Sequence, residues 1–290
     1  MVGGGEGTFA RDSSPGRNQS KGLEPSRAQC YLAAFMWRGK KIAVVVPAYR
    51  EARLIGRMLA RVPGFVDCLF VVDDASSDGT HRAAEASGDP RLSLIRHAEN
   101  RGVGAAIVTG YRAALAQHCD VLSVMAGDDQ MHPDDLEAVI APVASGAADY
   151  VKGNRFVHRE ARQMPLLRRA GGELLSFATR AATGLDVSDC QCGFTALAAD
   201  TARALPLSDL WPRFGYPNDL LGMLAARGAR VLEVPVRPVY ADEESGVRAF
   251  HAASILALIA RRYLKEARAS RTRDTSSLAA VVDAGLLDQE

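Results

Sequence analysis

The chain has 290 residues, of which 48% are hydrophobic and 24% charged, and its formal net charge is +1. This length and composition are typical of one large α/β domain, or of one domain with attached tails. Because the net charge is close to zero, the chain has no strong overall positive charge that would attract nucleic acid. The five cysteines, an odd number without paired spacing, argue against a disulfide framework and indicate a reducing compartment.

The two ends of the chain differ from its middle. Residues 1–38 are rich in Gly, Ser, Pro and charged residues, which predicts a disordered tail, and residues 269–290 are expected to be weakly ordered. The N-terminus has no apolar stretch typical of a signal peptide, and no segment reaches roughly 18 uncharged apolar residues. We therefore expect a cytoplasmic protein without a transmembrane helix, and peripheral contact with the cytoplasmic membrane face stays open.

Predicted strands and helices alternate four times between residues 41 and 145. Short apolar runs predict strands over residues 42–46, 68–72, 92–96 and 121–125. Helical spacing predicts helices over residues 51–62, from 78 or 80 onward, over 102–117 and over 133–144. This alternation indicates an α/β fold with a mostly parallel sheet and helices on both faces.

The second half is less regular. It is predicted to contain a helix over residues 164–184, one or two strands within 228–240, and a helix over 247–264. The last helix carries apolar residues at helical intervals and a basic end. It either lies on an anionic membrane leaflet or packs on the core, and the sequence leaves both open.

Polar residues follow the predicted strands where parallel strands place ligands, beyond their carboxyl ends. Asp128 and Gln130 follow the fourth strand and can offer oxygens to Mg²⁺ or Mn²⁺. The alternative is a helix cap before Pro133. Asp73 and Asp74 follow the second strand, where they either accept hydrogen bonds from a base or ribose or form an Asx turn with a cap.

The segment Asn100-Arg101-Gly102-Val103-Gly104 resembles a dinucleotide fingerprint only superficially. It follows the third strand rather than the first, and Ile107 stands where the third glycine belongs. We expect these glycines to let a backbone approach the helix or a ligand closely.

Two kinds of candidate residue occur in the second half. Arg155 and Arg168 carry guanidinium groups suited to phosphate recognition, although isolated arginines are also common on solvated surfaces. Asp219 stands near the start of an apolar helix and could be a cap or a functional carboxylate.

Eight segments between residues 41 and 250 resemble, in family order, the family 2 glycosyltransferases of the dolichyl-phosphate mannosyltransferase-like branch. They are VVVPAYREARLI, VVDDASSDGT, HAENRGVGAA, MAGDDQMHPDDL, VKGNRF, DCQCGFTAL, GYPNDLLGML and EVPVRPVYADEESG. The resemblance implies a GT-A fold over residues 39–268, with a nucleotide-binding half over 39–150 and an acceptor half over 151–268.

The resemblance also implies roles for individual residues. The nucleoside would be held by Pro47, Tyr49, Glu51, Asp73 and Asp74. The metal-binding turn would be formed by Asp128 and Gln130, and an acceptor phosphate would meet Arg155 and Arg168. Asp219 falls where inverting relatives often place an acidic residue that faces the acceptor.

Three positions depart from the family pattern. The usual acidic triplet, Asp-x-Asp, reads Ala126-Gly127-Asp128, so one metal ligand is missing, and Asp129 or a water could replace it. Gly172 stands where polyprenyl-phosphate enzymes can carry Ser. Ser245-Gly246 replaces a common Ser-Lys pair.

The predicted function is therefore a metal-dependent glycosyltransferase that uses a UDP- or GDP-sugar and inverts the anomeric carbon. The acceptor would be a polyprenyl phosphate at a membrane surface, or a soluble sugar or glycan hydroxyl, for which Asp219 would be the base. A non-catalytic nucleotide-sugar-binding protein is an alternative, because Ala126 replaces an acid. A nucleotidyltransferase fits less well, because the loop after the first strand lacks glycine.

Overall fold

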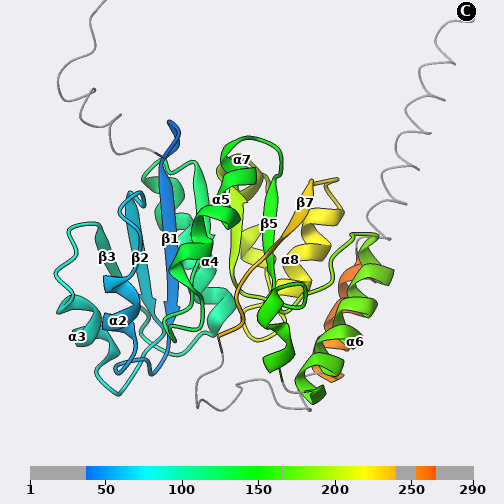
Figure 1. Ribbon diagram of the computed structural model, residues 1–290, viewed down its shortest axis with the longest axis horizontal. Helices are drawn as coiled ribbons and strands as arrows, with labels where there is room; N and C mark the ends of the chain where they lie inside the picture. Colours follow the sequence, from blue (N-terminus) through cyan, green and yellow to red (C-terminus); the bar gives the residue numbers. More distant parts are fainter. Residues whose placement is uncertain (1–36, 165, 240–252, 266–290) are drawn as a thin grey trace, which may run out of the picture. The chain divides into compact units, whose positions relative to one another are not determined.

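The computed structural model describes residues 37–164, 166–239 and 253–265. Residues 1–36 and 269–290 of the predicted tails lie outside this part. The described strands form one seven-stranded sheet in the order β3-β2-β1-β4-β6-β5-β7 (Figure 1). They are β1 (Ile42–Ala48), β2 (Cys68–Asp73), β3 (Leu92–Arg96), β4 (Val121–Val124), β5 (Tyr150–Asn154), β6 (Thr195–Ala198) and β7 (Val231–Pro235).

Helices connect these strands. The α-helices are α2 (Ile55–Ala60), α3 (Thr80–Glu85), α4 (Val103–Ala116), α5 (Leu136–Ala144), α6 (Leu166–Thr183), α7 (Ala199–Ala204) and α8 (Tyr216–Ala225), and residues 253–265 are also helical. Short 3₁₀ turns are η1 (Pro133–Asp135), η2 (Arg159–Gln163) and η3 (Leu207–Asp209).

The sheet is buried on both faces. Along β1, Ile42, Val44 and Val46 contribute to one core cluster, while Ala43 and Val45 contribute to the other. The first cluster includes side chains of α2, α3 and α5, and the second includes side chains of α4, α6, α8 and residues 253–265. The fold is thus three-layered, with helices on each side of the sheet.

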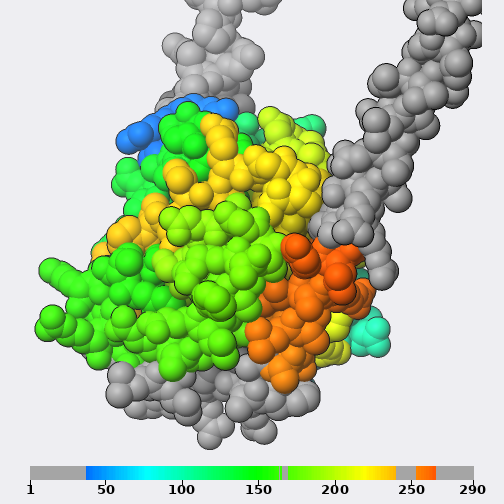
Figure 2. Space-filling view, turned by 90° about the vertical axis from the view of Figure 1, so that its right-hand side faces the viewer, coloured from blue at the N-terminus to red at the C-terminus, as the bar shows by residue number. Residues whose placement is uncertain are grey.

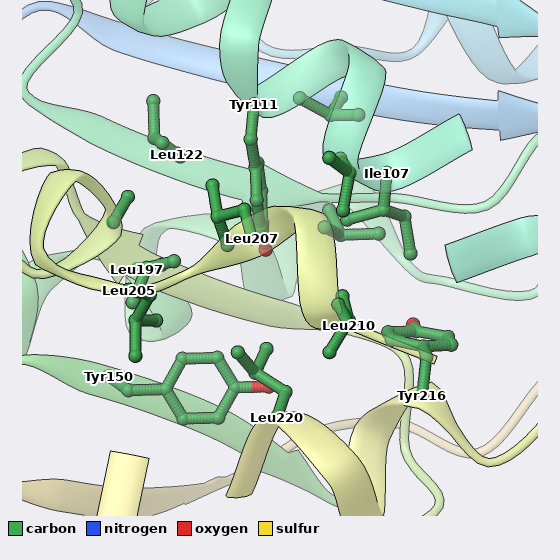
Figure 3. Packing of buried hydrophobic residues seen from close by; sticks show 14 of the residues in the cluster. Ile107, Tyr111, Leu122, Tyr150, Leu197, Leu205, Leu207, Leu210, Tyr216 and Leu220 are labelled. Atoms are coloured by element: carbon green, nitrogen blue, oxygen red, sulfur yellow. The ribbon is translucent and has the colours of Figure 1, made fainter. Parts of the chain in front are cut away.

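The second cluster joins the two halves of the sheet (Figure 3). Tyr111 of α4, Leu122 of β4, Tyr150 of β5 and Leu220 of α8 are all at most 1% exposed. Because these residues come from both halves of the chain, the two halves share this cluster.

The sequence-based elements of the first half are confirmed, with boundaries that differ by at most four residues. Strands β1 to β4 pair in parallel, as the alternation predicted. In the second half, β5 and β6 were missed. β6 runs antiparallel to both β4 and β5, so the β-α-β rhythm that carried the prediction ends there.

The helix over residues 253–265 packs on the core. Ile255, Leu258 and Ile259 are at most 8% exposed, and Ile255 and Ile259 belong to the cluster that contains α8. This decides against a membrane-facing role for these three apolar residues. The helix over residues 253–265 lies beside α6 at the surface (Figure 2). In the described part of the chain, every helix is too short or too polar to cross a bilayer.

Candidate active site

The loops that follow β1 and β2 are tied together at the carboxyl edge of the sheet. Three hydrogen bonds join them, from Arg50 N to Ser76 Oγ (3.0 Å), from Glu51 N to Thr80 Oγ1 (2.8 Å) and from Ala52 N to Asp78 Oδ2 (3.1 Å). Pro47 and Glu51 are half-buried, and the Tyr49 ring is 43% exposed. The predicted nucleoside-binding residues of β1 and its loop therefore lie beside Asp73, at the end of β2.

The adjacent carboxylates Asp73 and Asp74 have different surroundings. Asp73 Oδ1 accepts a hydrogen bond from Ser76 N (2.9 Å), while Oδ2 is buried without a hydrogen-bond partner in the described residues. Arg96 Nε lies 3.3 Å from Oδ2 and His81 Nδ1 lies 3.8 Å from it, within ion-pair range but outside hydrogen-bond geometry. Asp73 thus has unused acceptor capacity, which is rare for a buried oxygen.

Both oxygens of Asp74 are engaged within the protein. It accepts hydrogen bonds from Arg101 N (2.9 Å) and Gly102 N (2.7 Å), and its Oδ1 lies 2.7 Å from His97 Nδ1. The carboxylate therefore holds the segment that begins at Arg101 against the end of β2, and this network leaves less capacity for a ligand than Asp73 has.

The glycines of that segment accommodate a backbone, as the sequence predicted. A Cβ at Gly102 would lie 2.4 Å from Pro212 O, and one at Gly104 would lie 2.3 Å from Trp211 O. Ala105 N donates to Pro212 O (3.1 Å). The approaching chain, residues 211–212, comes from the second half of the chain, so these glycines join the two halves.

The predicted metal-binding turn follows β4. Asp128 and Gln130 are half-buried, and Gln130 N donates to Asp128 Oδ1 (3.0 Å). Asp129 points into a different environment, because its carboxylate is paired with Arg57 (2.6 Å) and Arg61 (2.9 Å). Asp129 is thus occupied in the structure and does not replace the acid missing at Ala126.

The turn nevertheless fits a hard cation that a substrate would share. Asp128 and Gln130 offer one carboxylate and one amide oxygen, and Mg²⁺ is commonly bound by one or two carboxylates together with substrate phosphates and waters. No group of three or more His, Cys, Asp or Glu side chains in the described part is placed to hold a metal. A cation here would therefore depend on oxygens from a bound diphosphate.

A pocket next to this turn brings both halves of the chain together. Asp128 and Gln130 line it from the first half, and Arg155 and Arg237 line it from the second. The remaining lining residues are Met131, Cys192, Gly193, Phe194, Val236 and Val239. Two guanidinium groups and the proposed metal turn thus face one cavity.

Arg155 is oriented by a buried carboxylate. Its Nε and Nη2 donate to Asp189 Oδ2 (2.8 Å) and Oδ1 (2.9 Å), and its backbone N donates to Oδ2 (3.1 Å). Burial alone would raise the pKa of Asp189, but the Arg155 charge and hydrogen bonds hold it below its usual value. Asp189 therefore remains ionised and fixes the guanidinium at the pocket wall.

Lys152 lies beneath the same wall. It is fully buried, and its Nζ donates to Cys192 O (2.5 Å). Burial lowers the pKa of this ammonium, although nearby Asp189 opposes the shift. Lys152 therefore ties β5 to the segment at Cys192 that lines the pocket.

The second predicted acceptor arginine, Arg168, belongs to α6, but its side chain lies outside the described residues. On the same helix, a Cβ at Gly172 would lie 2.9 Å from Phe156 Cζ. The Phe156 ring thus leaves little room for a side chain at position 172.

Asp219, near the start of α8, is almost completely buried. Arg262 Nε and Nη2 donate to its two oxygens (2.6 and 2.7 Å), and Trp211 N donates to Oδ2 (2.8 Å). Gly222 makes room for this arginine, since a Cβ there would lie 2.6 Å from Arg262 Cγ. Asp219 therefore joins α8 to the helix over residues 253–265, and it does not line the pocket.

Sequence reasoning missed two residues near the pocket. Asn218 is buried and connects three segments, because it contacts Gln191 Nε2 (2.6 Å), Thr179 Oγ1 (2.8 Å) and Cys190 Sγ (3.1 Å). Arg237 contacts residues 132–135, about a hundred positions earlier in the chain. The adjacent polar residues Asn218 and Asp219 in an apolar helix were the available signal for Asn218, whereas the pairing of Arg237 left no local pattern.

Comparison with known proteins identifies the family. The model of glycosyl transferase family 2 matches residues 43–202, more than half of the chain. The chain belongs to this family and is a glycosyltransferase.

Named relatives support the predicted branch. An undecaprenyl-phosphate mannosyltransferase of Micrococcus luteus is 30% identical over 212 residues, which cover 71% of this chain and 86% of that protein. A UDP-N-acetylglucosamine–dolichyl-phosphate N-acetylglucosaminyltransferase of Methanococcus voltae is 27% identical over 219 residues, with coverages of 70% and 87%. The chain thus falls in the dolichyl-phosphate mannosyltransferase-like branch.

A solved structure confirms the predicted GT-A fold. Glucosyl-3-phosphoglycerate synthase of Mycobacterium tuberculosis, in complex with Mn²⁺, UDP and phosphoglyceric acid, superposes with a TM-score of 0.60. The two sequences are 23% identical, and the match covers 78% of this chain and 79% of that one.

Proposed function

We propose that this glycosyltransferase takes a sugar from a UDP- or GDP-sugar and transfers it, with inversion, to a phosphate oxygen of a polyprenyl phosphate. Residues 39–268 would act as one GT-A domain, with residues 39–150 binding the nucleotide and 151–268 the acceptor. A polyprenyl acceptor resides in a membrane, so the enzyme would work at the cytoplasmic membrane surface. The names of the Micrococcus luteus and Methanococcus voltae relatives support this acceptor class.

The observation that carries the acceptor class is the environment of Asp219. A general base must reach the proton that it removes, whereas both Asp219 oxygens accept hydrogen bonds from Arg262 and one also from Trp211 N. A phosphate oxygen is already anionic and needs no base. In this proposal Asp219 acts in catalysis as a positioning residue that fixes the start of α8.

The nucleoside would bind at the ends of β1 and β2. Asp73 Oδ2 has unused acceptor capacity and would accept a hydrogen bond from the base. Because Asp73 is fully buried beneath Arg96, we expect the half-exposed Arg96 side chain to move when a nucleotide binds. Pro47, Tyr49 and Glu51 would form the adjoining wall, and Asp74 would hold the neighbouring loop in place.

Asp128 and Gln130 would hold the Mg²⁺ or Mn²⁺ ion. When bound, such a cation neutralises charge on a diphosphate leaving group. Asp128 contributes to catalysis by fixing the position of the donor diphosphate, and Arg155 lies across the same pocket, where it would meet the acceptor phosphate with Arg168. The pocket is therefore the place at which donor and acceptor phosphates would meet.

A non-catalytic nucleotide-sugar-binding protein is the second candidate. It is favoured by Ala126 and by the engagement of Asp129 with Arg57 and Arg61, which leave the turn with Asp128 as its acidic ligand. It predicts donor binding without transfer to any acceptor. Transfer to a soluble sugar hydroxyl remains a third outcome and would require Asp219 to leave Arg262.

The test is sugar transfer from labelled UDP-glucose and GDP-mannose to polyprenyl phosphate in vesicles, with and without Mn²⁺, by wild-type protein and Asp128→Ala. We expect Mn²⁺-dependent glycolipid formation that falls about 100-fold or more in Asp128→Ala. Asp200→Asn, at an exposed surface pair, is the control and should keep wild-type activity.

Other outcomes would replace the proposal. Donor binding without product on lipid or soluble acceptors would support the binding protein. Product on a soluble sugar alone would move the acceptor class to hydroxyls.

A further inference from the structure

Arg237 joins the acceptor half to the segment that follows the proposed metal turn. It comes two residues after β7 and lines the pocket with Asp128 and Gln130. Its backbone N donates to Asp135 Oδ2 (2.7 Å) and its Nε donates to Asp135 Oδ1 (3.1 Å). Its Nη1 lies 3.2 Å from His132 Nε2. All of these contacts are with residues of η1 or with His132, which caps it.

The charges around Arg237 argue against a direct role in phosphate binding. Besides Asp135, its Nη2 reaches Asp134 Oδ2 (3.4 Å), so one guanidinium faces two carboxylates. The local charge is net negative, which repels an anion. A guanidinium that forks onto a carboxylate is instead suited to fixing the relative position of two segments.

The metal turn is fixed from both sides. On the nucleotide side, Asp129 is paired with Arg57 and Arg61, and its backbone is left-handed, with φ of 57°. On the acceptor side, Arg237 holds the segment that begins at His132. Only residues 130 and 131 lie between these two anchors, so the direction of the Gln130 side chain depends on both.

We infer that Arg237 is a positioning residue that orients the metal turn formed by Asp128 and Gln130. This inference rests on the proposed function. Because the turn lacks the acid usual at position 126, the two remaining ligands must be held in register by their neighbours. Removing the hydrogen-bond partner of a metal ligand commonly weakens metal binding about 10- to 100-fold. Arg237 acts one step further out, through Asp135 and His132, so we expect the lower end of this range.

The experiment is calorimetric titration of Mn²⁺ into the full chain with saturating UDP or GDP, and of each nucleotide without metal. We expect Arg237→Gln to weaken Mn²⁺ binding about 10-fold or more, and to leave metal-free nucleotide affinity unchanged. Arg230→Gln is the matched control. Arg230 precedes the same strand and forks onto Asp149 away from the pocket, so its loss should leave Mn²⁺ binding unchanged.

Asp135→Asn separates positioning from direct phosphate binding. If Arg237 acts by holding Asp135, the Asn variant should also weaken Mn²⁺ binding. If Arg237 binds phosphate directly, removing the competing carboxylate should strengthen nucleotide binding, which would overturn the inference. The inference is also overturned if the Mn²⁺ affinity of Arg237→Gln equals that of Arg230→Gln.

The melting temperature of each variant shows whether it folds, and Arg237→Lys replaces Arg237→Gln if the latter does not. A lysine lacks the fork and should weaken Mn²⁺ binding as well, so wild-type Mn²⁺ affinity in a folded Lys variant overturns the inference. If the wild-type chain binds no Mn²⁺ with either nucleotide, the proposed metal site and this inference both fail. If the wild-type chain binds Mn²⁺ and the Arg237 variants bind it equally well, only the inference fails and the proposed metal site stands.

Discussion

The two halves of the molecule fix their functional loops in different ways. In the nucleotide half, side-chain oxygens accept hydrogen bonds from backbone amides 26 to 29 residues away, as Ser76, Thr80 and Asp74 do. In the acceptor half, arginines pair with carboxylates over longer separations, 34 residues for Arg155–Asp189 and 43 for Arg262–Asp219. The first half is therefore held mainly by hydrogen bonds between neighbouring strand–loop units, with the pairs of Asp129 to Arg57 and Arg61 as its long-range exception. The second half depends on charge pairs between distant segments.

The largest effect on stability is expected from removing the buried ion pair between Arg262 and Asp219. In Arg262→Met, the buried Asp219 carboxylate loses its ion-pair partner, and breaking a buried pair costs about 3–5 kcal/mol in the free energy of unfolding. Urea unfolding measures this cost. Lys265→Met is the control, because its pair with Asp209 is exposed and screened by water, so its loss should change the stability little. Equal effects in the two variants would show that the buried pair is not structural.

The second prediction compares adjacent acids of the nucleotide half. Asp73→Asn should weaken nucleotide binding roughly 10- to 100-fold with little loss of stability, because a charged acceptor is lost from the proposed base site. Asp74→Asn should instead lower the free energy of unfolding by about 1–3 kcal/mol, since Asp74 satisfies buried amides. Calorimetry and urea unfolding of both variants check the assignment, and reversed results would exchange the two roles.

The third prediction concerns the contact between the halves. Gly104→Ala would place a Cβ 2.3 Å from Trp211 O, so the backbone must shift. We expect a loss of about 1–3 kcal/mol in the free energy of unfolding. Gly171→Ala, in α6 with nothing within 4 Å of its Cβ, should instead gain about 0.5–1 kcal/mol. Thermal or urea unfolding that shows similar changes in both variants would contradict the close approach.

The smallest expected change is a dependence on pH. The pKa of Asp189 is raised by burial but lowered overall by Arg155. A carboxyl whose pKa is lower in the folded state stabilises the fold above its unfolded pKa, about 3.9, and loses this contribution as the pH falls through the folded pKa. Urea unfolding should show wild type more stable than Asp189→Asn near neutral pH, with the gap narrowing below about pH 4. A gap that stays constant with pH would contradict the pairing.

The pattern of apolar residues predicted most of the first half. Runs such as residues 68–72 are apolar because their strands are covered on both faces, and this burial is encoded locally. β5 and β6 were missed because their sequences contain polar residues, Lys152, Asn154 and Thr195, whose burial is possible only with distant partners. The candidate site shows the same difference. The sequence revealed the acids at the strand ends, but it did not reveal which carboxylates the arginines pair with.

By itself the sequence determined the family, the GT-A fold and the alternation of strands and helices that brings acids to one edge of the sheet. Only the tertiary structure decided how neighbouring acids differ. Asp73 retains unused acceptor capacity while Asp74 is satisfied, and Asp129 is paired with arginines while Asp128 lines the pocket. The physical reason is that periodicity reports burial, a local property, whereas the use of a charge depends on which distant group the fold places within hydrogen-bond reach.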